Sequence, residues 1–217
     1  KRDYGAEGSV AHHQSDLWAH STPVGLDRVR IPMSARWMMW NMALPWLSLQ
    51  LYDHDQYQHD ERFLREDLYP VMRETARFLR STFSRVEGRL CNLPTTSPEN
   101  MYSDAAGRAL AVCKMSAIDI GIAKEFALAY AEVLRRINEP EDAVYWTQFS
   151  RDVLDYSVSE NGELNEWDEA FEQTELGHRH FSMLFGVYPG SGLLGSEFEP
   201  AARKALQTRL EQGSGQT

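Results

Sequence analysis

The sequence MSAIDIGIAKEFALAYAEVLRRI at residues 115–137 carries the strongest structural signal in the chain. Its apolar side chains recur at alternating spacings of three and four residues, namely Met115, Ile118, Ile122, Phe126, Ala129, Val133 and Ile137. This spacing places them on one face of an amphipathic helix. We therefore predict a helix here that packs its apolar face against the core of a mainly helical protein.

Outward from this segment, helices remain the dominant pattern. Residues 60–83 show a second apolar face, and Pro70 predicts a kink or a restart within it. Residues 34–54 are apolar on nearly all sides, which predicts a helix buried on most sides. Further helices are expected to begin at Pro140 and Pro200, because proline is favoured in a first helical turn.

Long segments without periodicity separate these helices, at residues 1–33, 84–113 and 155–180. Strand signals are weak and limited to short pieces such as residues 89–93. Loops of this length inside a compact domain are usually functional. Loops from alternate connections of a helical barrel open at the same end, so these three segments are expected to converge on one pocket.

Composition narrows the class of partner. The 217 residues carry a formal net charge of −10 and contain no Lys/Arg-rich run, which argues against nucleic acid and against an anionic membrane surface. The apolar stretch at residues 37–51 is too short and too polar to span a bilayer. Cys91 and Cys113 are too few to indicate a disulfide framework or a zinc site. A neutral or weakly charged substrate fits best.

The three long segments hold most of the unusual polar side chains. The candidate site residues are His12, His13, Asp16 and Trp18 in the first segment, Glu99 and Asn100 in the second, and Glu166, Trp167, His178, Arg179 and His180 in the third. Most of the six tryptophans are expected to be core residues, and Trp18 and Trp167 stand out because they lie beside acids.

The sequence around Glu99 allows two interpretations of its role. Ser97 and Pro98 before it form a common helix start, in which an acid is favoured by the helix dipole. Alternatively, Glu99 is a carboxylic acid on a loop stiffened by proline. Enclosed beside aromatic side chains, such an acid would have a raised pKa and would protonate a leaving group.

The histidines of the first and third segments suggest a metal site, which Asp16 or Glu166 would complete. However, no HExxH pattern, cysteine pair or dense carboxylate cluster accompanies them. Hydrogen bonding to sugar hydroxyl groups is the favoured role, and structural histidines at helix ends are the alternative.

Five segments taken together resemble glycoside hydrolase family 95, which includes 1,2-α-L-fucosidases and some α-L-galactosidases. They are AHHQSDLW (11–18), ARWMMWNMALPWLSLQLYDH (35–54), LPTTSPEN (93–100), GELNEW (162–167) and GHRHFSMLFGVYPG (177–190). The resemblance covers almost the whole chain in matching order, and the SPEN and HRH motifs are its most specific parts.

This resemblance implies an all-α fold, an (α/α)6 barrel of which residues 1–217 form about half, as one partial catalytic domain lacking both ends. It implies an inverting glycoside hydrolase without metal or cofactor that releases terminal α-1,2-linked L-fucose from glycans. Glu99 takes the role of general acid. The HRH segment would bind the sugar, and the remaining candidate residues would line the pocket.

The chain departs from the family pattern at Gln14 and Ser15, where Asn-Thr is usual, and at Met183, where a second histidine is usual. The water-activating asparagine pair and aspartate of the family lie before and after this region. The chain would therefore hold the acid half of the site, with the remainder of the same enzyme as its partner. The resemblance also implies secretion. The alternatives are a hydrolase of another sugar, such as an α-L-galactoside, or an incomplete helical fragment with no activity alone.

Overall fold

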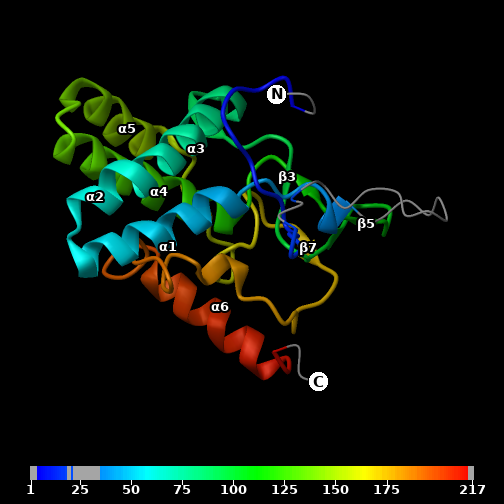
Figure 1. Ribbon diagram of the computed structural model, residues 1–217. Coiled ribbons are helices and arrows are strands. Elements are labelled where there is room, and N and C mark those ends of the chain that lie inside the picture. The colour runs from blue at the N-terminus through cyan, green and yellow to red at the C-terminus, as the bar shows by residue number, and fades with distance from the viewer. Residues whose placement is uncertain (1–3, 19–20, 22–34, 215–217) are drawn as a thin grey trace.

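The computed structural model describes residues 4–18, 21 and 35–214, and it places the helices α1 to α5 together with short strands and loops beside them (Figure 1). The helices of three turns or more are α1 (Ala43–Gln58), α3 (Tyr69–Thr82), α4 (Ala117–Arg136), α5 (Pro140–Asp152) and α6 (Glu199–Glu211).

Helix α4 lies at the centre of this arrangement. Ser116 caps it by accepting a hydrogen bond from the backbone N–H of Asp119 at 3.4 Å. The apolar face predicted for this helix is confirmed, because its side chains are buried and Ile137 at its end is half-buried. Helix α5 begins at Pro140, as predicted, and packs against α4 as an antiparallel hairpin.

The predicted helix over residues 60–83 is also confirmed. It consists of α2 (Glu61–Phe63), a π-helical segment η2 (Leu64–Leu68) and α3. Pro70 has no N–H to donate, and just before it the N–H of Tyr69 reaches back five residues to the carbonyl of Leu64. The π-helical turn is thus the interruption that the proline predicts.

The predicted helix over residues 34–54 is wrong in its first part. A single 3-10 turn, η1 (Ala35–Trp37), precedes an irregular segment, and α1 begins only at Ala43. The irregular segment is fixed by tertiary contacts, since the indole Nε1 of Trp40 donates to Asp119 at 2.8 Å. A distant partner has therefore overridden the local helical pattern.

Helix α1 is also less enclosed than predicted. Its buried residues are Pro45, Ser48 and Asp55, whereas Leu47 is 47% exposed. The buried Asp55 carboxylate forms an ion pair with Arg136 at the end of α4, which ties the two helices together. One stripe of α1, made of Leu47, Gln50, His54 and Tyr57, is exposed.

Short strands occupy the loops, so the all-α expectation holds for the helical core but not for these segments. The strands are β1 (Ser84–Val86), β2 (Arg89–Cys91), β3 (Thr95–Thr96), β4 (Tyr102–Ser103), β5 (Ala109–Leu110), β6 (Val112–Cys113) and β7 (Glu172–Gln173). β1 pairs with β2, β3 with β6, and β4 with both β5 and β7, all antiparallel. The weak strand signal near Arg89 is confirmed as β2.

The two larger apolar clusters hold the helices together. The larger lies between α1, α3, α4 and α5. The smaller joins α6 to the 3-10 turn η3 (Ser182–Leu184) through residues such as Leu193 and Ala202. Helix α6 begins at Glu199 with Pro200 in its first turn, as predicted. Among the described residues, no helix is both long and apolar enough to cross a membrane.

Candidate active site

A four-residue loop at residues 97–100 presents Glu99. It follows β3 and is closed by a hydrogen bond from the N–H of Asn100 to the carbonyl of Ser97 at 2.8 Å. The carbonyl of Pro98 accepts from Ser182 Oγ at 3.0 Å and from His180 Nδ1 at 3.1 Å. The Pro98–Glu99 peptide bond is cis. The loop is therefore held on one side by the segment that contains the HRH motif.

The Glu99 carboxylate has two partners from distant parts of the chain. Its Oε2 forms an ion pair with Arg179, and its Oε1 lies 3.3 Å from His13 Nε2. The Glu99 side chain is 15% exposed, while that of Arg179 is 56% exposed. The acid is thus largely enclosed, whereas its guanidinium partner keeps access to solvent and to a ligand.

Opposing effects set the pKa of Glu99. Burial raises the pKa, but the hydrogen bond and charge of Arg179, together with His180 and His13, outweigh burial and bring it below the ordinary value. Burial also lowers the pKa of His13, even though the neighbouring Glu99 carboxylate raises it. In this arrangement Glu99 is ionised at neutral pH.

Hydrogen bonds to the backbone determine which ring nitrogen carries the proton in His178 and in His180. His180 Nδ1 donates, because its partner is the Pro98 carbonyl, which only accepts. His178 Nδ1 accepts the backbone N–H of His180 at 3.1 Å, so its proton resides on Nε2 when the ring is neutral. Burial, and then the charge of His180, lowers the pKa of His178 to about 4, which keeps that ring neutral above this pH.

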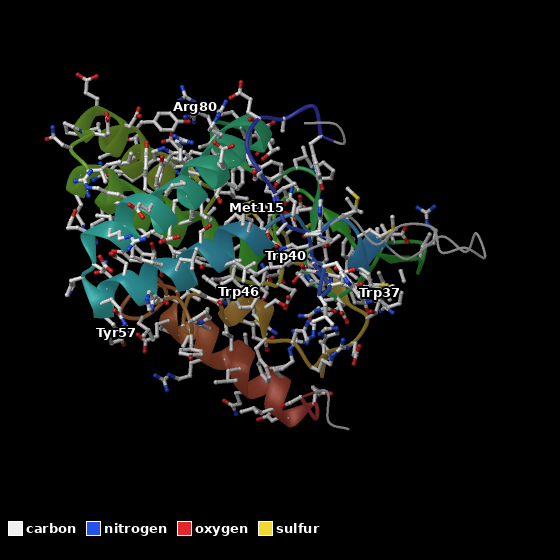
Figure 2. All side chains as sticks on the ribbon, viewed as in Figure 1. Trp37, Trp40, Trp46, Tyr57, Arg80 and Met115 are labelled. Carbon is white, nitrogen blue, oxygen red and sulfur yellow. The ribbon has the colours of Figure 1, made fainter. Side chains whose placement is uncertain are left out.

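A cavity of about 360 Å³ lies beside this cluster. Its lining residues are His13, Trp40, Trp46, Pro98, Ile118, His180, Phe181, Ser182, Phe185, Tyr188 and Pro189. Figure 2 shows Trp40 and Trp46 near the start of α1. The rings form a continuous edge-to-face series, with 6.3 Å between the centroids of His13 and Trp40, 6.2 Å from Trp40 to Trp46 and 5.8 Å from Trp46 to Phe185.

A second, larger cavity of about 530 Å³ runs along α1 and α4. It shares Trp46, Phe185, Tyr188 and Pro189 with the smaller cavity, so the two are neighbours. The larger cavity is also lined by carboxylates, among them Asp53, whose pKa is raised by burial and by Glu125. The smaller cavity has an aromatic wall and lies beside the acid, because His13, the partner of Glu99, lines it. This is the arrangement expected of a site for one sugar ring.

The candidate residues of the first segment, at residues 12–18, lie in different places. His13 lies at the acid, but His12 is only 4% exposed, and its ring contacts Tyr4 Oη at 2.7 Å and the Ser21 carbonyl at 2.8 Å. Asp16 accepts a hydrogen bond from the N–H of Trp18, whose indole is 76% exposed. The structure thus brings His13 into the site and places His12 behind it, with Asp16 and Trp18 on the surface.

Three further predicted residues lie beneath the site. Asn100 is 1% exposed and donates to Gln173 Oε1 at 3.2 Å. Trp167 is also 1% exposed and packs in a small cluster with Tyr102. Glu166 is 2% exposed and accepts a hydrogen bond from Ser97. All three are at most 2% exposed, so we assign them to the support of the acid loop.

Two supporting residues carry no signal of their role in the sequence. Asp119 is fully buried and accepts from Trp40 and from Thr95 Oγ1, at 2.8 Å and 2.7 Å. Arg209 is 1% exposed and pairs with Glu166 at 3.0 Å. A charged residue on an amphipathic helix normally indicates the solvated face, so neither sequence position carried a signal of burial.

Metal ligation would require several donors to converge on one point. Within residues 4–18, 21 and 35–214, no group of three or more His, Cys, Asp or Glu side chains is arranged to hold a metal ion. The histidines near Glu99 are instead engaged with a carboxylate, a backbone carbonyl and a backbone N–H. Hydrogen bonding and proton transfer are therefore the chemistry that these side chains support.

Comparison with known proteins identifies relatives of the chain as a whole. Residues 1–217 match the model of the glycosyl hydrolase family 95 catalytic domain. The chain is 34% identical over 220 aligned positions to Alpha-L-fucosidase 2 of Arabidopsis thaliana, covering 98% of this chain and 25% of that protein. It is 25% identical over 206 positions to Probable alpha-fucosidase A of Aspergillus niger, covering 85% and 23% respectively. The chain thus spans about a quarter of the length of these relatives.

Proposed function

This chain belongs to glycoside hydrolase family 95, and on that premise we propose that it forms the acid-bearing part of an inverting α-L-fucosidase acting on terminal α-1,2-linked L-fucose. The observation that carries this proposal is Glu99, largely enclosed between His13 and Arg179 beside an aromatic cavity. The fucosidase names of the two relatives support the sugar.

Glu99 must carry a proton to act as a general acid. In the free site Arg179 favours the ionised carboxylate. We propose that the hydroxyl groups of a bound sugar draw the exposed Arg179 away from Glu99, while the sugar ring covers the carboxyl. Both changes raise the pKa of Glu99, because one removes a neighbouring cation and the other removes water. The acid is then protonated where the leaving oxygen arrives.

The proposed reaction breaks the bond between the anomeric carbon and the glycosidic oxygen. Glu99 protonates that oxygen, and a water molecule attacks the opposite face of the oxocarbenium-like sugar. The described lining of the smaller cavity includes no carboxylate side chain, so no base for the attacking water is found there. We propose that the residue activating this water comes from the part of the enzyme outside residues 1–217, in keeping with the length of the relatives.

The proposed architecture is about half of an (α/α)6 barrel. Two antiparallel helical pairs support it, one formed by α1 and α3 and the other by α4 and α5. Their connections alternate between short links and the long segment at residues 84–116 that carries the acid. The described side chains proposed to contact the sugar are His13, Arg179 and His180, with the Trp40 and Trp46 rings as the wall.

The test is Glu99→Gln in the natural protein that contains this chain. We expect release of L-fucose from a 2′-fucosylated oligosaccharide to fall by about 10²-fold to 10⁴-fold, because a general acid contributes that much. The exposed Glu141→Gln on α5 is the control and should keep wild-type turnover. Near-normal turnover of Glu99→Gln would refute the assignment.

A hydrolase of another sugar is the second candidate, since an aromatic wall covers an α-L-galactoside as well as an α-L-fucoside. Comparing aryl α-L-fucoside with aryl α-L-galactoside separates the two. Hydrolysis of neither substrate by the natural protein would favour an incomplete helical domain without activity.

A further inference from the structure

A buried ion pair lies directly below the acid loop. Glu166 Oε2 and Arg209 Nη2 are 3.0 Å apart, and both side chains are 1% exposed. The other carboxylate oxygen of Glu166 accepts the hydroxyl of Ser97, two residues before Glu99. Burying two charges carries a large desolvation cost, so such a pair is a weak source of stability and is better explained by the geometry it fixes.

The same guanidinium also holds the loop that leads to the HRH motif. Arg209 Nη1 donates to the carbonyls of Glu175 at 3.2 Å and Leu176 at 2.8 Å. The loop lies very close to the end of α6, because a Cβ added at Gly177 would be 2.1 Å from the carbonyl oxygen of Gln212. Arg209 therefore fixes the backbone from which Arg179 projects.

We propose that Arg209 is a positioning residue that holds the loop bearing Arg179 in register with the loop bearing Glu99. The buried clamp, defined as Glu166 with Arg209, connects the two loops from beneath, while Glu99 and Arg179 meet above it. Arg209 is only 1% exposed, so it acts through the loops rather than on the sugar. The expected effect of Arg209 on catalysis rests on the proposed function, whereas its effect on the contact between Glu99 and Arg179 does not.

The first variant is Arg209→Met, which removes both hydrogen bonds to the loop but leaves the Glu166 charge buried without its partner. The second, Glu166→Gln with Arg209→Met, has no stranded charge, and its new amide oxygen still accepts the Ser97 hydroxyl. The double variant therefore releases the HRH loop while leaving the acid loop tethered. Arg203→Met is the matched control, because Arg203 lies on the same helix but pairs with Glu199 at the surface.

The readout is the pKa of the Glu99 carboxyl in this chain, measured by ¹³C NMR of labelled glutamate and assigned with Glu99→Gln. Circular dichroism first establishes that each variant is folded. We expect the double variant to raise the pKa of Glu99 by about one unit or more, because Arg179 is no longer held beside it. The control should leave the pKa unchanged. A folded double variant with the wild-type pKa would overturn the proposal.

Activity gives an independent second readout. In the natural protein we expect the double variant to lower kcat by about 10-fold to 100-fold with a smaller effect on KM, because a sugar that Arg179 and His180 no longer hold in register with Glu99 receives its proton more slowly. If the wild-type protein releases no fucose, the proposed function fails. The NMR result still decides whether Arg209 positions the two loops.

Discussion

Replacing Asp119 by asparagine tests the electrostatics of the fully buried carboxylate beneath the acid loop. Asp119 Oδ1 accepts the indole N–H of Trp40, and Oδ2 accepts the side chains of Asn92 and Thr95, at 2.8 Å and 2.7 Å. Burial raises the pKa of Asp119 to about 6, although these hydrogen bonds oppose the rise. The ordinary value, which applies to the unfolded chain, is 3.8.

The sign of the pH dependence follows from these two values. Because the folded state has the higher pKa, it binds more protons than the unfolded state between about pH 4 and pH 6. The contribution of Asp119 to the free energy of unfolding is therefore fully present below the unfolded value and is lost as the pH rises through the folded value. A difference of about two units corresponds to about 3 kcal/mol.

Asparagine has the shape of aspartic acid but does not titrate. Asp119→Asn destabilises the fold at every pH, because its NH₂ group faces hydrogen-bond donors that then lack an acceptor. However, this penalty should be about 2 to 3 kcal/mol larger at about pH 4 than at about pH 7.5, because only the wild-type protein loses stability in between.

The assay is urea unfolding of both proteins at these two pH values, followed by tryptophan fluorescence and circular dichroism. Asp67→Asn on the exposed side of η2 serves as the control and should show no comparable difference between the two pH values. An Asp119→Asn penalty that is equal at both pH values, or larger at the higher one, would refute the reasoning. It would mean that the hydrogen bonds keep the carboxylate ionised in the folded state.

Two further predictions concern packing and the thiols. Gly8→Ala should lower the free energy of unfolding by about 2 kcal/mol more than Gly5→Ala. Both glycines have a positive φ, but only at Gly8 would a Cβ meet the Glu74 carbonyl oxygen, at 2.1 Å; equal losses in urea unfolding would contradict this. Cys91 and Cys113 are free, buried and have raised pKa values, so neither should react with a disulfide reagent until urea unfolds the chain. Rapid labelling of the folded chain would contradict their burial.

The sequence predicts those parts of the fold that depend on local pattern. Helix α4 follows from its apolar spacing, and α5 and α6 follow from proline in their first turns. The segment before α1 could not be predicted in this way. Its tryptophans and methionines match a helical pattern, but Trp40 is held by Asp119, which lies 79 residues further along the chain. Local pattern contains no information about such a partner.

The candidate site, like the fold, is predictable from sequence only where a local motif indicates it. The SPEN motif indicates Glu99, and the HRH motif indicates the segment that contacts it. The supporting residues were not recognisable, because the burial of a charge depends on its partner. Arg209 looks like an exposed helical arginine until Glu166, 43 residues earlier, is placed beside it. For the same reason, His12 and His13 cannot be distinguished in sequence, although only His13 lies at the acid.

The wide separation of the partners of the acid loop also determines when the site forms during folding. Four residues of this region form hydrogen bonds to side chains far along the chain. The sequence separation is 24 residues for Thr95, 69 for Ser97, 80 for Glu99 and 84 for Pro98. Each of these contacts closes a long loop, and its entropic cost is met only after the intervening helices have packed. The α4–α5 hairpin, by contrast, needs only local contacts. A chain with all its helices formed can therefore still lack the acid site, and we expect this site to assemble after the helices.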